Sequence, residues 1–292
     1  MLKQRVLTAI VMLLVLLPAL FHPQPWPFLA LALVMVGAGG WEWGRLNGLG
    51  GAGSWLLGLL VGAACGLAWA AGWPQASLRE LWLAAGAFWI LTTLLLLRGG
   101  VAAWAAVPRM LRLCGGVLVL LLAWLAIAQA RVLGVEFLLS VFVLVWAADI
   151  GAYFAGRALG QKLFPRKLAP AISPGKSWEG ALGGAVVVMV VGVVWSQLSP
   201  QVPGVSGNLY ALLRDAGWPV FVLAVLFLTV MSVSGDLLES LVKRSAGAKD
   251  SSQLLPGHGG VLDRVDALLP VLPLAMICLL YTSDAADEGL GV

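Results

Sequence analysis

Apolar runs recur along almost the whole chain, and their length constrains the fold more than any other feature. A helix needs about 20 apolar residues to cross the hydrocarbon core of a bilayer. With 61% hydrophobic and 11% charged residues, the chain has no long polar stretch that could form a separate soluble domain. We therefore predict one all-α, polytopic integral membrane protein with about nine transmembrane helices, at residues 6–21, 26–41, 54–73, 80–97, 113–130, 133–154, 178–197, 217–235 and 266–281.

Basic residues are unevenly divided between the two sides of this arrangement. We take residues 6–21 as a retained first helix, because no small-residue cleavage site follows them. If the N-terminus is cytoplasmic, all of the 18 basic residues except Arg79, Arg131 and Arg214 fall on the cytoplasmic side. Such an excess of Lys and Arg is typical of cytoplasmic loops. We predict a multi-pass protein of a bacterial-type inner (plasma) membrane, with two long cytoplasmic basic segments at 156–177 and 236–265.

Polarity divides the chain into regions. Residues 1–130 are predicted to be transmembrane scaffold, in which Glu42 and Arg45 flank an interfacial Trp-Glu-Trp-Gly turn without a catalytic role. Residues 131–277 hold most of the unusual charges and form the predicted catalytic region. Residues 278–292 begin with Cys-Leu-Leu-Tyr-Thr-Ser-Asp-Ala-Ala-Asp-Glu, which looks like a translated sequencing adapter. We predict that this segment is a non-native tail and exclude it from functional reasoning.

Charge is most concentrated between Ser240 and Asp266, where seven charged side chains, a histidine and four glycines follow one another. A helix would extend this cluster backward, because Ser232, Asp236, Ser240 and Lys243 share one helical face. The resulting stripe of hydroxyl, carboxylate and ammonium groups begins inside an apolar span. It suits a metal ion and a phosphate better than lipid.

The second half of this cluster predicts a tight loop and a pair of carboxylates. Pro256 and the glycines beside His258 allow the backbone to approach a ligand closely, although His258 could equally serve only to stabilise the loop. Asp263 and Asp266 share a helix face. Carboxylate oxygens favour Mg²⁺ over zinc, and the cysteines show no paired spacing for a disulfide or a metal site.

Two upstream segments add candidates. Asp149 is a carboxylate inside an apolar span, which marks either a functional site or a structural hydrogen bond near a helix end. Ser173-Pro-Gly-Lys-Ser-Trp-Glu-Gly leads into the span at 178–197, where Ser173 or Ser177 can cap the helix. Lys176 beside that helix start could bind an anion. The basic residues before this segment, Lys162, Arg166 and Lys167, could simply face lipid headgroups.

In this order, the residues resemble the phosphatidate cytidylyltransferases (CDP-diacylglycerol synthases). From Ser240 to Asp266 the chain has a Ser, a Lys-Arg pair, a Lys-Asp pair, Pro-Gly-His-Gly-Gly and Asp-Arg-x-Asp. Ser-Pro-Gly-Lys-Ser-Trp-Glu-Gly and Trp-Ala-Ala-Asp-Ile-Gly-Ala-Tyr also look like family elements. The resemblance covers most of 130–277 and implies transfer of the cytidylyl group of CTP to phosphatidate, giving CDP-diacylglycerol and pyrophosphate.

The implied reaction brings two polyanions together, which calls for a divalent cation and basic side chains. The expected cofactor is Mg²⁺, with a second cation left open. The expected partners are CTP, membrane phosphatidate and, as an open alternative, a second copy in a homodimer, without nucleic acid. The predicted catalytic residues are Asp236, Asp263, Lys243, Lys249 and Asp266; the metal ligands are Asp236, Asp263 and Asp149; the substrate-binding residues are Ser173, Lys176, Ser240, Arg244, His258, Gly259, Gly260, Arg264 and Asp149.

Two other functions remain open. A polyprenol kinase would also use CTP but would transfer only the γ-phosphate to a lipid alcohol. An ion-coupled transporter would use Asp149 and the Asp236 stripe as an ion path. Its usual marker, matched broken helices in two repeated halves, is not visible.

Overall fold

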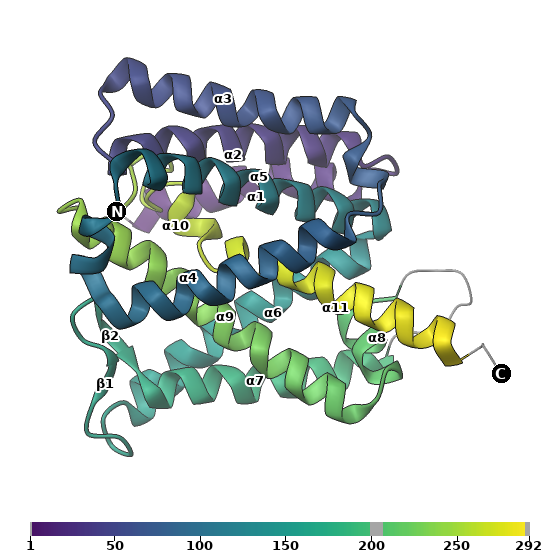
Figure 1. The fold of residues 1–292 in the computed structure, drawn as a ribbon. Helices are drawn as coiled ribbons and strands as arrows, with labels where there is room; N and C mark the ends of the chain where they lie inside the picture. The colour runs from purple at the N-terminus through teal and green to yellow at the C-terminus, as the bar shows by residue number, and fades with distance from the viewer. Residues whose placement is uncertain (1, 199–206, 290–292) are drawn as a thin grey trace.

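Long helices form almost the entire structure, a computed structural model that describes residues 2–198 and 207–289 (Figure 1). Short elements join them at both ends. The long helices are α1 (Leu2–Phe21), α2 (Trp26–Leu46), α3 (Gly51–Ala70), α4 (Arg79–Ala106), α5 (Arg109–Leu133), α6 (Val135–Leu159), α7 (Trp178–Leu198), α9 (Trp218–Ser245) and α11 (Leu268–Gly289). The short elements are η1 (Trp73–Gln75), β1 (Lys167–Ala169), β2 (Ser173–Ser177), α8 (Leu209–Asp215) and α10 (Leu262–Val265).

The predicted all-α polytopic fold is confirmed. Within the described residues, eight helical stretches are long and apolar enough to cross a membrane, and the last of them is Leu262–Tyr281. The long helix that is not among them is α2, whose C-terminal half holds Glu42 and several glycines. The small β1–β2 hairpin and α8 were not predicted. The proposed non-native tail stays a prediction; α11 runs to residue 289, and residues 290–292 lie outside the described part.

The long helices run back and forth between two ends of the molecule. The start of α1 and the hairpin lie at one end, and α8 and the end of α11 lie at the other (Figure 1). The loop between α9 and α10 also lies at the hairpin end. The two basic segments predicted at 156–177 and 236–265 are therefore on one side of the bundle, as the threading of the chain requires.

Close contact between α6 and α7 builds one wall of the site. A Cβ atom at Gly184 would lie 2.6 Å from the carbonyl oxygen of Ala148, so a larger residue would push the two helices apart. Small residues at helix contacts are the usual way to bring backbones close together in a membrane. The apolar core continues into α5 and α9, where Trp124 and Val225 are fully buried.

Candidate active site

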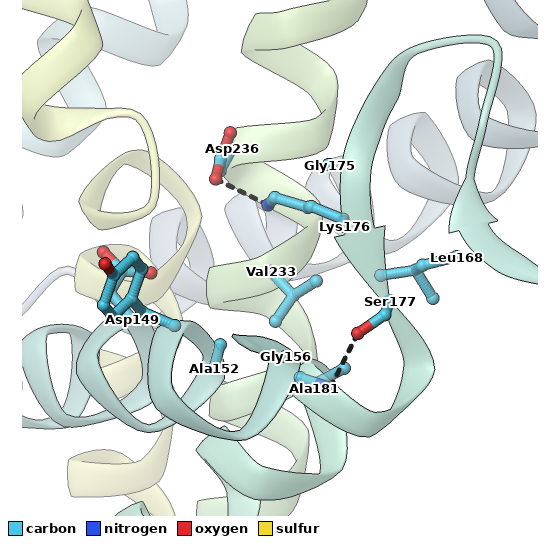
Figure 2. Close-up of a pocket in the computed structure, with 12 residues that line it drawn as sticks. Asp149, Ala152, Gly156, Leu168, Gly175, Lys176, Ser177, Ala181, Val233 and Asp236 are labelled. Carbon is cyan, nitrogen blue, oxygen red and sulfur yellow. Dashed lines mark hydrogen bonds and ion pairs between the residues drawn. The ribbon is translucent and has the colours of Figure 1, made fainter. Parts of the chain in front are cut away.

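A pocket of about 310 Å³ opens between α6, α7, α9 and β2 at the hairpin end (Figure 2). Asp149 from α6, Lys176 from β2 and Asp236 from α9 line it together. The Lys176 ammonium lies 2.5 Å from Asp236 Oδ2. Most of the remaining wall is small or apolar, with Ala152, Gly156, Gly180, Ala181 and Val233. The pocket therefore joins a charged centre to a surface that an acyl chain could contact.

Asp236 is held at both oxygens. Lys176 pairs with Oδ2, and the Ser240 hydroxyl donates to Oδ1 over 3.3 Å. Asp266 lies near enough for its charge to interact with those of Asp236 and Asp149. Its approach depends on Gly235, because a Cβ there would lie 2.6 Å from the Asp266 carbonyl oxygen. Three predicted site carboxylates from three helical segments are thus brought together.

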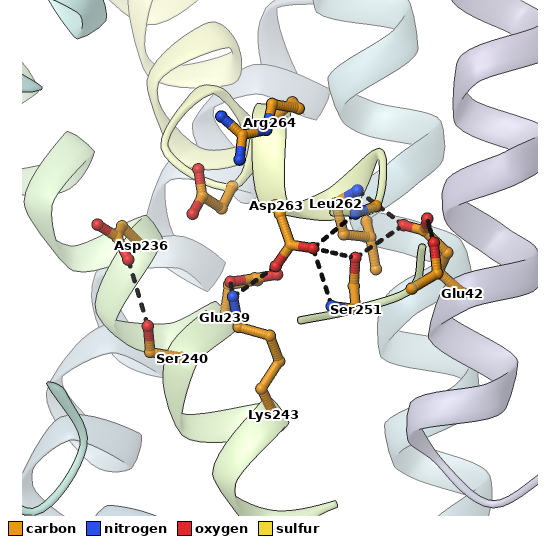
Figure 3. Close-up of polar contacts among 12 residues, drawn as sticks. Glu42, Asp236, Glu239, Ser240, Lys243, Ser251, Leu262, Asp263 and Arg264 are labelled. Carbon is orange, nitrogen blue, oxygen red and sulfur yellow. Dashed lines mark hydrogen bonds and ion pairs between the residues drawn. The ribbon is translucent and has the colours of Figure 1, made fainter. Parts of the chain in front are cut away.

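Asp263 faces a different set of partners (Figure 3). Its Oδ1 accepts a hydrogen bond from the Lys243 ammonium at 2.6 Å, and Lys243 also forms an ion pair with Glu239. Its Oδ2 accepts from the Ser251 amide at 2.9 Å, the Ser251 hydroxyl at 2.8 Å and the Gly260 amide at 2.8 Å. Both oxygens are therefore engaged by the protein. Asp263 organises the loop and does not present an open face to the pocket beside Asp236.

The two groups together contain more carboxyl groups than ammonium groups. Five carboxylates accompany two ammonium groups: Asp149, Asp236, Glu239, Asp263 and Asp266 against Lys176 and Lys243. Ionising all five would leave uncompensated charge in a partly buried site, and a bound cation would offset that cost. Within residues 2–198 and 207–289, however, no three His, Cys, Asp or Glu side chains are already arranged as a metal-ligand group.

The loop after α9 is tight, as predicted. The Leu255 amide donates to the Gly259 carbonyl and the His258 amide donates to the Leu255 carbonyl, each at 2.8 Å. Gly257 and Gly259 have φ values of +77° and +84°, which favour glycine. The His258 carbonyl accepts from Arg264 Nε at 2.9 Å, whereas its buried Nδ1 has no hydrogen-bond partner within the described part of the chain.

The remaining predicted residues lie around these groups. Arg244 Nε donates to the Ile172 carbonyl over 3.4 Å and so links α9 to the hairpin turn. Lys249 is exposed and lines a second cavity of about 590 Å³ with Arg45. Ser173 begins β2, where it pairs with Ala169. It does not line the Asp149 pocket, so its predicted substrate contact has no direct support from this geometry.

Ser177, not Ser173, caps α7. Its hydroxyl accepts a hydrogen bond from the Gly180 amide at 3.1 Å. Glu179, in the first turn of α7, is buried and accepts from the amides of Leu163 at 3.0 Å and Phe164 at 2.9 Å. These bonds attach the start of the hairpin segment to α7 and so help to place Lys176.

The sequence reasoning missed Glu42. The Trp-Glu-Trp-Gly segment is not an interfacial turn but the C-terminal half of α2, in which Glu42 is completely buried. Its carboxylate contacts the loop that carries Ser251 and Ser252. The signal that could have found it was present, because an acidic residue inside an apolar span is costly and marks a functional candidate. Glu42 directly follows the predicted span 26–41, whereas α2 continues to Leu46, so the rule that identifies Asp149 did not reach it.

Comparisons with known proteins agree on one family. A family model described as the cytidylyltransferase family matches residues 3–282. The phosphatidate cytidylyltransferase of Pseudomonas aeruginosa is 39% identical over 280 residues, covering 94% of this chain and 95% of that protein. The protein of the same name from Haemophilus influenzae is 38% identical over 294 residues, with 94% and 96% covered. That of Brucella suis is 47% identical over 152 residues, with 52% and 48% covered.

Proposed function

The chain belongs to the cytidylyltransferase family, and we propose that it transfers the cytidylyl group of CTP to phosphatidate, forming CDP-diacylglycerol and pyrophosphate. Relatives aligned over nearly their whole length carry the name phosphatidate cytidylyltransferase. The observation in this chain that best supports the proposal is the pocket in which Asp149, Lys176 and Asp236 meet beside an apolar wall. A phosphate that carries acyl chains requires such a junction, and the charged side of the pocket can also face the phosphates of a nucleotide.

The chemistry requires charge compensation more than proton transfer. A phosphate oxygen of phosphatidate attacks the α-phosphorus of CTP. The bond from that phosphorus to the oxygen bridging the α- and β-phosphates breaks, and its electrons leave with pyrophosphate. A phosphomonoester has a second pKa of about 6, so much of the nucleophile is already dianionic at neutral pH. The protein therefore has to hold the two anions together in line, and needs no general base.

We assign Asp149, Asp236 and Asp266 to hold a divalent cation, with Mg²⁺ as the proposed ion and a second cation as an open addition. Their hard oxygen donors and the excess of carboxyl over ammonium groups around them fit such an ion. When bound, the cation neutralises phosphate charge. Asp263, first predicted as a leading ligand, is reassigned to a supporting role because its two oxygens accept four hydrogen bonds and it does not line the pocket, whereas Asp236 has two contacts and lines it.

The basic side chains are proposed to contact the phosphates. Lys176 lies in the pocket itself and is the first candidate, while Lys243 is held between two carboxylates. Lys249, Arg244 and Arg264 are exposed around the loop and could meet the triphosphate as it enters. We place this end of the bundle on the cytoplasmic side of an inner membrane, since CTP comes from the cytosol and basic loops favour that side.

The test of the reaction supplies the full-length chain in membranes with phosphatidate and CTP labelled either in cytidine or at the γ-phosphate. We expect cytidine label in lipid, and only when phosphatidate is present. Transfer of the γ-phosphate alone to a lipid alcohol would identify a kinase instead. Absence of both labels from lipid would reject the proposed function.

The cation assignment has its own test, which does not depend on turnover. Mn²⁺ binding is followed by electron paramagnetic resonance on the purified protein and on Asp236→Asn. We expect at least a tenfold loss of affinity in this variant. Asp215→Asn is the matched control, because Asp215 lies in α8 at the opposite end of the bundle. Equal Mn²⁺ affinities in all three proteins would remove Asp236 from the cation site.

A further inference from the structure

Glu42 makes an unusually complete set of hydrogen bonds for a buried acid. It is 0% exposed on α2, yet its carboxylate accepts four bonds from a segment more than two hundred residues later in the chain (Figure 3). Oε1 accepts from the Ser252 hydroxyl at 2.6 Å and the Val261 amide at 2.9 Å. Oε2 accepts from the Ser251 hydroxyl at 3.1 Å and the Leu262 amide at 2.8 Å. Each oxygen thus has one backbone N–H and one hydroxyl within hydrogen-bond distance, and the single Ser251 proton is shared with Asp263 Oδ2.

This pattern indicates that the negative charge itself is needed. An ionised carboxylate costs several kcal/mol to bury unless it is well compensated. Within the described residues, Glu42 has these four donors and no cationic partner. Only a carboxylate offers two oxygens that accept in all four directions. A carboxamide of the same shape would turn its NH₂ group toward a backbone N–H in either orientation.

The bonds from Glu42 lead directly to Asp263. Ser251 lies between the two acids, and its one hydroxyl proton is shared between Glu42 Oε2 at 3.1 Å and Asp263 Oδ2 at 2.8 Å. The Val261 and Leu262 amides that bind Glu42 immediately precede Asp263 along the backbone. Asp263 in turn accepts from the Lys243 ammonium at 2.6 Å. The position of Lys243 at the end of α9 therefore depends, through this series, on a side chain of α2.

The packing around Gly260 supports the same conclusion. A Cβ atom at this position would fall on Glu42 Oε1 and the Ser251 hydroxyl, and would lie 2.7 Å from Glu42 Cδ. The absence of a side chain lets the backbone close over the carboxylate, and the Gly260 amide then donates to Asp263 at 2.8 Å. This gives Gly260 a steric role beyond the substrate contact predicted for it.

We propose that Glu42 is a positioning residue for cytidylyl transfer: it fixes the loop of residues 250–262, and through Ser251 and Asp263 it fixes Lys243. This inference rests on the proposed function for its kinetic part. Glu42 does not line the pocket with Asp149, and none of the 250–262 loop does either. Loss of Glu42 should therefore slow the reaction more than it weakens phosphatidate binding.

The test compares Glu42→Gln with the unsubstituted full-length enzyme in lipid nanodiscs. We expect kcat to fall at least tenfold, with the KM for phosphatidate changed less than twofold. Hydrogen–deuterium exchange should accelerate at Val261 and Leu262. It should stay unchanged at Leu163 and Phe164, whose amides bind Glu179 instead. Glu80→Gln is the matched control, because Glu80 is exposed at the start of α4, and its kcat should stay within twofold.

Ser252→Ala keeps the test usable if Glu42→Gln does not fold. It removes one of the four donors and should lower kcat about threefold while loosening the same amides. The proposal is overturned if kcat and Val261 exchange remain unchanged in the variant that folds. It is also overturned if exchange accelerates equally over all helices while kcat per folded enzyme is retained. If the unsubstituted enzyme forms no cytidine-labelled lipid, the proposed function fails. Exchange at Val261 and Leu262 then still tests whether Glu42 fixes the loop of residues 250–262.

Discussion

Two polar segments at the hairpin end are each held by one buried glutamate, but in different ways. Residues 160–177 are attached by Glu179, which uses one oxygen to accept two backbone amides 15 and 16 residues away. Its other oxygen is buried without a hydrogen-bond partner in the described part of the chain. Residues 246–266 are attached by Glu42, which uses both oxygens and reaches across more than two hundred residues.

The two segments therefore differ in how firmly they are held: residues 160–177 less firmly and residues 246–266 more firmly. The hairpin segment delivers Lys176 from β2, in which Pro174 and Gly175 are exposed. Besides the bonds to Glu179, the only polar contacts that attach it to α9 in the described residues are the Arg244 bond to the Ile172 carbonyl and the Lys176–Asp236 ion pair. The second loop is attached to Glu42 on one side and to Asp263 on the other. Buried polar networks of this kind specify one arrangement when all of their members are satisfied. We infer that the hairpin is the more adjustable of the two segments and that the loop of residues 250–262 is the more rigid.

The largest effect is expected for Asp263→Asn, which disrupts the more rigid segment, residues 246–266. Its Oδ2 receives three donors and its Oδ1 receives Lys243, so the NH₂ group of Asn must face a donor in either orientation. Breaking a buried charge pair costs about 3–5 kcal/mol. We expect at least a hundredfold fall in cytidine-labelled lipid formed per folded enzyme. Asp215→Asn serves as control, and near-normal turnover by Asp263→Asn would remove this acid from the working site.

Lys176→Met tests the more adjustable segment, the hairpin, and should have the next largest effect. The substitution keeps a long side chain but leaves Asp236 without its 2.5 Å ammonium partner in the pocket. A hydrogen bond between charged groups contributes about 1.5–3 kcal/mol, so we expect roughly a tenfold or greater fall in kcat/KM for CTP. The control is Lys162→Met, since that ammonium is exposed and donates to the Ala158 carbonyl. Equal losses in the two variants would mean that only the general basic charge matters.

The same comparison shows how far the sequence could predict this site. Spacing along one helix placed Asp236 and Ser240 together, and the structure has them hydrogen-bonded. Contacts between helices were not predictable in this way. Residue chemistry suggested Asp263 as a partner of Asp236, but packing directs it to Lys243 and Ser251. The acid at Glu42 had a local signal, its place at the end of an apolar span, but its partners come from the far end of the chain and could not be predicted from the sequence of α2.

Glu179→Gln compares the two buried glutamates directly, because it makes the same substitution as Glu42→Gln in the residue that holds the hairpin segment. Here the amide oxygen can replace Oε1 and accept from Leu163 and Phe164, with the NH₂ group at the unpartnered oxygen. We expect less than a threefold change in kcat, against at least tenfold for Glu42→Gln. Both variants are measured in the same nanodisc assay. A Glu179→Gln defect as large as that of Glu42→Gln would contradict the distinction between an adjustable and a rigid segment.

The smallest effect is expected for Ser177→Ala, at the junction of β2 and α7. The substitution removes the cap that the Ser177 hydroxyl provides to the Gly180 amide. Loss of such a cap costs about 1 kcal/mol of stability. The midpoint of thermal unfolding in detergent should therefore fall by about 2–4 °C. Ser177→Thr, which retains a hydroxyl, is the control. Because Lys176 immediately precedes this cap, an adjustable hairpin predicts that kcat changes less than twofold despite the lower stability. A large loss of kcat with an unchanged midpoint of thermal unfolding would show instead that the hairpin must be held as rigidly as the loop of residues 250–262.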